Sequence, residues 1–104
     1  MSIIKGVLEE EYKRLQSLIG KYRHEAAKLP RGALSIKEIA GRQYVYIAYR
    51  SGKKVIFDYV GKASSEGVKK LQEDVRKRKE YEAKIKSVKR DIKELERALG
   101  GRKI

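Results

Sequence analysis

Residues 42–62 read RQYVYIAYRSGKKVIFDYVGK. Val, Ile, Phe and Tyr fill two short runs on either side of Ser51-Gly52-Lys53, which is typical of two strands joined by a tight turn. The segment therefore predicts a β-hairpin, with tyrosines on both faces between Arg and Lys. Because a sheet needs only one apolar face to cover a core, the second face is free for another contact.

The flanking sequence predicts a third strand and two helices. Residues 4–28 carry apolar side chains at spacings of three and four, which indicates an amphipathic, coiled-coil-like helix that ends before Pro30. A strand at about 34–39 extends the hairpin to a β-meander over about 33–61. Ser64 or Ser65 can cap a second helix over about 65–99. The expected fold is one α+β domain, residues 1–104, with an antiparallel helical pair against a three-stranded antiparallel meander.

The long second helix carries two separate apolar stripes. Val68, Leu71 and Val75 share one face, and a second stripe lies roughly 110° around the axis at 100° per residue. The second stripe consists of Tyr81, Ile85, Val88, Ile92, Leu95 and Leu99, and the last five are the predicted helix-packing residues. We expect the first stripe to cover the sheet and the second to pack on another helix, either residues 4–28 or a second copy. Since helix 4–28 is the shorter, the sequence predicts a homodimer.

The composition indicates an anionic partner. The net charge is +13, from 27 basic and 14 acidic residues, and residues 29–63 carry 7 basic residues against 2 acidic ones. Such an excess is typical of proteins that bind nucleic acid or an anionic membrane surface. The chain has no Asn and no Thr but many Lys and Glu, which favours a thermophile. We also expect an archaeal source.

The residue inventory argues against an enzyme. There is no Cys and one His, His24, and the carboxylates of the middle segment, Glu38 and Asp58, are isolated. These residues assemble no catalytic group, no metal site and no cofactor site. Apolar runs are too short to span a membrane, and the first residues lack a signal-peptide core. We therefore expect a cytoplasmic protein without a membrane partner.

Strand alternation separates a core face from a binding face. Val45 and Ile47 share the face expected to cover the core, so Tyr44 and Tyr46 should point outward. Aromatic rings stack on bases, and Arg and Lys neutralise phosphates. Helix cations add a basic stripe, although Glu-to-Lys pairs four residues apart also mark an ordinary solvent-exposed helix. The predicted nucleic-acid-binding residues are Arg42, Tyr44, Tyr46, Arg50, Lys53, Lys54, Lys62, Lys79, Lys86 and Arg90.

The segment from Leu29 to Gly61 carries a recognisable pattern. Its matching positions are Leu29-Pro30, Gly32, Gly41-Arg42, Tyr44, Tyr46, Tyr49-Arg50, Gly52, Lys54-Val55, Tyr59 and Gly61-Lys62. The pattern resembles small basic proteins of archaea and bacteria in which a helix, a Tyr-rich β-meander and a second charged helix follow in order. The resemblance implies a link to mobile elements. A similar sheet occurs in the DNA-binding parts of some recombinases, whose catalytic residues are absent here.

These observations predict a non-enzymatic DNA-binding protein. The tyrosine face and the hairpin tip would contact the duplex, largely through its backbone. An alternative is a coiled-coil adaptor or antitoxin-like module that binds another protein through its helices. A third possibility is an RNA-binding protein that stacks bases.

Overall fold

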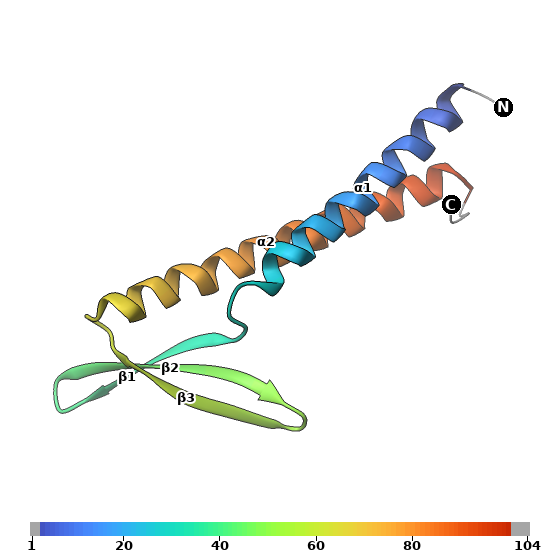
Figure 1. Ribbon diagram of the computed structural model, residues 1–104. Coiled ribbons are helices and arrows are strands. Elements are labelled where there is room, and N and C mark those ends of the chain that lie inside the picture. The colour runs from blue at the N-terminus through green and yellow to red at the C-terminus, as the bar shows by residue number, and fades with distance from the viewer. Residues whose placement is uncertain (1–2, 101–104) are drawn as a thin grey trace. The chain divides into compact units, whose positions relative to one another are not determined.

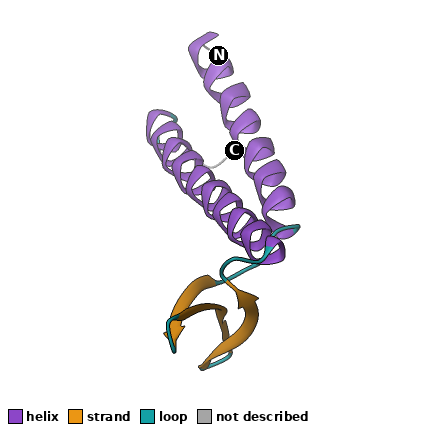
Figure 2. Ribbon diagram, turned by 90° about the vertical axis from the view of Figure 1, so that its left-hand side faces the viewer, coloured by secondary structure: helices purple, strands orange, loops and turns teal. Residues whose placement is uncertain are grey.

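The computed structural model of the protein describes residues 3–100. Its elements are α1 (Ile3–Ala27), β1 (Ala33–Ile39), β2 (Arg42–Ser51), β3 (Lys54–Lys62) and α2 (Glu66–Ala98) (Figure 1). The three strands form one antiparallel sheet in the order β1-β2-β3, drawn in orange in Figure 2. The predicted α+β class, with a helix before and after a β-meander, is confirmed.

The turn between β1 and β2 has two residues. Ile39 pairs with Arg42, which leaves Ala40 and Gly41 as the loop. Their φ angles are 52° and 79°. Positive φ at both central positions is the requirement of a type I′ turn, whose twist matches that of the flanking strands. Ala40 meets this requirement at a conformational cost that glycine or asparagine would largely avoid.

The turn between β2 and β3 is equally short and sets the register of that pair. Ser51 pairs with Lys54 across Gly52-Lys53, and counting back along both strands brings Tyr46 opposite Tyr59. The pairing then shifts by one residue, so that β3 contains one extra residue there. Such a β-bulge reverses the in-and-out alternation of the residues that follow it.

The contacts divide the chain into two compact units. The sheet unit comprises Lys28–Lys79, which includes the whole sheet and the N-terminal part of α2. The helical unit combines α1 with α2 from Glu80 onward. The predicted single domain over residues 1–104 stays a prediction, because α2 takes part in both units.

In the sheet unit, the first turns of α2 pack on the sheet. Val45 at the centre of β2 is fully buried, and Val68 of α2 is 1% exposed. Gly61 lies beneath Val68, because a Cβ placed on Gly61 would stand 3.1 Å from that side chain. Its φ of 154° also favours glycine. The Ser65 Oγ accepts a hydrogen bond from the Val68 backbone amide at 3.3 Å, so Ser65 is the helix cap.

The rest of the sheet-unit helix is held by burial and by one long-range hydrogen bond. Val75 is 4% exposed. Arg78 donates a hydrogen bond from Nη1 to the Leu29 carbonyl oxygen at 2.8 Å, which ties α2 to the segment before β1. The predicted role of the first apolar stripe, which is to cover the sheet, is confirmed at Val68 and Val75.

In the helical unit, α1 and the C-terminal part of α2 run antiparallel (Figure 1). The rings of Tyr22 and Tyr81 lie 5.9 Å apart towards one end of the pair, and Leu8 and Leu99 line a shared depression towards the other. The buried core consists of Tyr12, Leu15, Ile19, Val88 and Ile92, with Leu18, Tyr22, Ile85 and Leu95 packed against it. Of the two partners left open by the sequence, helix 4–28 of the same chain is therefore the one observed.

This packing changes the reason for expecting a dimer. The second apolar stripe is covered by α1 of the same chain, so a second copy is not needed to bury it. The homodimer stays a prediction. Within the described residues, the helical unit leaves apolar side chains exposed at the start of α1, at Ile3, Ile4 and Val7.

Candidate nucleic-acid interface

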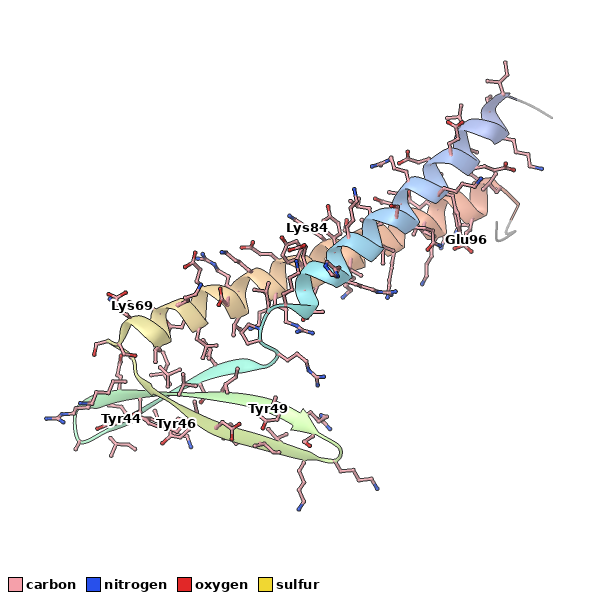
Figure 3. All side chains as sticks on the ribbon, in the orientation of Figure 1. Tyr44, Tyr46, Tyr49, Lys69, Lys84 and Glu96 are labelled. Carbon is pink, nitrogen blue, oxygen red and sulfur yellow. The ribbon has the colours of Figure 1, made fainter. Side chains whose placement is uncertain are left out.

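The register assigns each strand residue to one of two faces of the sheet. Val45 and Ile47 lie on the face that α2 covers, and Tyr44 and Tyr46 lie on the opposite face (Figure 3). We name the opposite face the outer face. Its larger side chains are Lys37, Ile39, Arg42, Tyr44, Tyr46, Arg50, Val55, Phe57, Tyr59 and Lys62. The predicted outward orientation of Tyr44 and Tyr46 is therefore confirmed.

Tyrosine rings from two strands form a cluster on the outer face. The Tyr59 ring of β3 lies 5.4 Å from the Tyr46 ring, edge to face, and 6.2 Å from the Tyr44 ring, tilted by 51°. Such tilted pairs are favourable aromatic contacts. Tyr44, Tyr46, Tyr59 and Ile39 line an open depression of ≈ 360 Å³. The cluster therefore presents rings and a shallow hollow to solvent.

Lys37 of β1 joins this cluster from the neighbouring strand. Its Nζ lies 4.8 Å from the centre of the Tyr46 ring and 5.5 Å from the centre of the Phe57 ring. A cation at these distances is attracted by the negative faces of the rings. Positive charge thus lies within the aromatic surface as well as around it.

The acidic residues of the sheet are confined to one face. All residues of the three strands are described, and the outer face carries four cations, Lys37, Arg42, Arg50 and Lys62, but no carboxylate. The two acidic residues, Glu38 and Asp58, both lie on the other face. The outer face is therefore more strongly cationic than the composition of residues 29–63 suggests.

Asp58 has a local partner on its own face. The Tyr49 hydroxyl donates a hydrogen bond to the Asp58 carboxylate at 2.9 Å. This hydrogen bond, together with the negative charge of Asp58, raises the pKa of Tyr49 above its ordinary value. Tyr49 therefore lies on the covered side of the sheet and bonds to a residue of that side, whereas Tyr44, Tyr46 and Tyr59 lie on the outer face.

The bulge in β3 brings Lys62 to the outer face. Plain alternation from Tyr59 would put Lys62 on the side of Asp58. The shift between Val45 and Tyr46 instead pairs Lys62 directly with Tyr44. Bulges commonly re-aim a side chain in this way. Lys62 and Arg42 then line a second depression of ≈ 460 Å³, together with Gly41, Gln43, Ala63 and Ser64.

The remaining predicted site residues lie elsewhere. Lys53 is in the β2–β3 turn, and Lys54 pairs with Ser51, which puts it on the covered side of the hairpin tip. Lys79 is exposed on α2 within the sheet unit, whereas Lys86 and Arg90 are exposed on the helical unit. The structure therefore gathers Arg42, Tyr44, Tyr46, Arg50 and Lys62 on one face of the sheet unit.

The predicted site lacked five of the larger residues of the outer face, of which three are charged or aromatic. These three are Lys37, Phe57 and Tyr59. A signal for two of them was present, because a two-residue turn at Gly52-Lys53 implies that Tyr59 faces Tyr46 and that Phe57 faces Ala48. Lys37 required the register of β1, which depends on the Ala40-Gly41 turn.

The described residues contain no metal-ligand cluster and no long apolar helical stretch. No group of three or more His, Asp or Glu side chains among residues 3–100 is placed to hold a metal ion. Neither α1 nor α2 has an apolar stretch of the length needed to cross a membrane. The exposed features of the sheet unit are thus a charged and aromatic surface.

Comparison with known proteins identifies the family. The sequence pattern described as Domain of unknown function (DUF6788) matches residues 2–70, more than half of the chain. The chain belongs to the DUF6788 family. The DUF6788 pattern covers all three strands, so the whole outer face lies within it. No curated protein and no solved structure matches the chain. The link to mobile elements and the archaeal or thermophilic origin stay predictions.

Proposed function

We propose that this protein is a non-enzymatic DNA-binding protein and that the outer face of its sheet binds the DNA. The cations of that face would neutralise phosphates, and the tyrosine cluster would contact the nucleotides between them. One observation carries the proposal, namely that four cations and no carboxylate share a face with exposed aromatic rings. A face needed only for solubility has no reason to exclude acidic residues in a chain that contains 14 of them.

The hairpin tip extends this surface beyond the sheet. Lys53 and Lys54 follow Arg50 at the β2–β3 turn, so three cations lie within five residues of chain. Phosphate contacts of this kind position a protein on nucleic acid without reading its sequence. We therefore propose that binding is largely directed at the backbone and tolerant of sequence.

Charge reversal at two matched sites tests the proposal. One variant replaces three sheet cations by Glu, at Arg50, Lys53 and Lys54. The other replaces three helix cations by Glu, at Lys86, Arg90 and Lys93. Both change the net charge equally, and fluorescence anisotropy with a labelled DNA oligonucleotide measures their affinities. We expect the sheet variant to lose more affinity, because its region has few acidic neighbours, and greater loss in the helix variant would contradict the proposed surface.

The helical unit supports a second candidate function. Ile3, Ile4 and Val7 are 86%, 72% and 58% exposed at the start of α1. Exposed apolar side chains in one place favour a protein partner. A coiled-coil adaptor or antitoxin-like role, or a homodimer, would use this end of the helices. The absence of any affinity for DNA or RNA at low salt would favour this function over the first.

A further inference from the structure

The outer face is unusually apolar for a surface that only contacts phosphates. Four of its side chains are more than half exposed: Ile39 (53%), Val55 (52%), Phe57 (53%) and Tyr59 (56%). Exposed apolar groups gathered in one place mark an interaction surface. Phosphate binding needs only the cations, so these side chains imply a partner that also has flat, apolar surfaces to cover.

The tyrosine geometry leaves ring surface available to such a partner. The Tyr59 ring is tilted by 51° from the Tyr44 ring and by 61° from the Tyr46 ring, so no two of these rings are stacked face to face. The hollow bordered by Ile39 and the three rings is open to solvent, and ≈ 360 Å³ is at the lower end of the range for small-ligand sites. A planar heterocycle can lie in it against at least one ring.

Unpaired nucleotides present such heterocycles, whereas a duplex does not. In a double helix the base faces are stacked on one another, and only their edges reach the grooves. Base edges are read mainly by Arg, Lys, Asn and Gln, and the hollow itself has only tyrosine hydroxyls as polar side-chain groups. Stacking on aromatic rings is instead how proteins hold single strands, with little preference for sequence.

The positions of the cations suit a single nucleic-acid strand that runs across the sheet. Arg42 and Lys62 lie at one end of the outer face and Arg50 at the other, about 26 Å apart along β2 at ~3.3 Å per residue. Lys37 lies between them beside Tyr46. A strand on the rings would therefore have a cation near its phosphates at both ends and in the middle.

Charge argues against a second copy of this chain as the occupant. Two outer faces brought together would oppose four cations with four others, and the face holds no carboxylate to pair with them. Burying like charges against each other is strongly unfavourable. A polyanion with apolar faces complements both the charge and the rings.

We infer that the outer face binds unpaired nucleotides, with bases stacked on Tyr59, Tyr46 and Phe57 and phosphates held by Lys37, Arg42, Arg50 and Lys62. The inference rests on the proposed function and narrows its substrate to single-stranded nucleic acid. It also assigns the central contact to Tyr59 of β3. Tyr59 is the most exposed of the three clustered tyrosines, and its ring touches both of the others.

The test compares probes that differ in their bases but not in their phosphates. The probes are an oligothymidine strand of about 12 nucleotides, an abasic strand with the same number of phosphates, a duplex of the same length, and oligouridine RNA. We expect the thymidine strand to bind more tightly than the abasic strand and the duplex at equal salt. Tyrosine fluorescence, undisturbed because the chain has no Trp, should be quenched by the thymidine strand alone among the DNA strands.

Matched variants show whether the stacking is on the outer face. Tyr59→Leu removes a ring but keeps an apolar side chain, and we expect about 5- to 140-fold weaker binding of the thymidine strand. Tyr49→Leu makes the same change on the covered side and should leave the binding of that strand within about twofold. Circular dichroism verifies that both variants keep their secondary structure.

The outcomes separate this inference from the proposed function. Duplex binding that equals or exceeds strand binding, with the abasic strand bound as well as the thymidine strand, overturns the inference and leaves DNA binding in place. Failure to bind any probe overturns both. Tighter binding of oligouridine than of oligothymidine supports stacking of unpaired bases but transfers the function to RNA. Self-association that Tyr59→Leu abolishes assigns the face to a second copy and overturns the inference.

Discussion

Removing two cations from the outer face should lower the salt dependence of binding by a calculable amount. Arg42 and Lys62 line one depression beside the tyrosine cluster. Arg42→Gln with Lys62→Gln removes two positive charges and leaves the rings intact. Both side chains are exposed, so the effect on stability should stay within about 0.5 kcal/mol.

The magnitude follows from the number of cations. Four cations on the outer face and two at the hairpin tip would release roughly six counterions, which gives a slope of log affinity against log salt of about −5 on a duplex and about −4 on a single strand. Losing two contacts should reduce the slope by about 1.8 on a duplex or about 1.4 on a single strand. Between 50 and 200 mM salt, the wild type should lose roughly 1,000-fold in duplex affinity and the variant roughly 100-fold.

Anisotropy titrations over a salt series measure the slopes. The matched control is Lys86→Gln with Arg90→Gln, which also removes one Lys and one Arg but acts on the helical unit. Its slope should equal that of the wild type. An unchanged slope for the sheet variant with a reduced slope for the helix variant would refute the assignment of the outer face. Equal reductions in both would mean that binding follows net charge alone.

Four further results are expected. Ala40→Asn should stabilise the protein by about 0.5–1 kcal/mol in chemical denaturation, because Asn tolerates the positive φ of this type I′ turn better than Ala; a loss of stability would contradict that turn geometry. Ile92→Ala should cost about 2–5 kcal/mol, measured by denaturant unfolding, since Ile92 is 7% exposed in the helical core. Tyr49→Phe should remove one phenol that titrates above the ordinary tyrosine pKa of about 10 in a spectrophotometric titration. Because the fold raises this pKa, the contribution of Tyr49 to stability is present below pH 10 and is lost as the pH rises through the raised value. Val7→Glu should weaken any homodimer in sedimentation equilibrium, and a dimer that resists this change would exclude the exposed start of α1 as its interface.

Local patterns in the sequence were sufficient to predict the helices and strands and to assign the side chains of β2 to its two faces. A cap at Ser64 or Ser65 follows from hydroxyls placed just before an apolar-periodic segment, and the structure shows that the Val68 amide uses Ser65. The outward position of Tyr46 follows from the burial of Val45 beside it, since neighbours on a strand point to opposite sides. Both conclusions need only the positions of residues close together in the chain.

Features that depend on pairing between strands could not be obtained in this way. The bulge near Val60 comes from a one-residue shift against β2, and no local sequence signal requires it there. Lys62 reaches the outer face only because of that shift. The dimer prediction had a similar weakness, because it assumed that a shorter helix leaves the stripe of α2 uncovered, whereas α1 packs against that stripe from Ile85 to Leu95.

The outer face is therefore the part of this molecule that folding does not explain. Val45, Val68 and Gly61 give the sheet one covered side, and the two hairpin turns set the register of its strands. Burial of apolar area contributes about 25 cal/mol per Å², and half-exposed Phe57 and Tyr59 lose much of that contribution in the unbound protein. The proposed partner, which supplies both flat apolar groups and negative charge, would account for that loss and for the exclusion of carboxylates from the same face. A strand with unpaired bases supplies both.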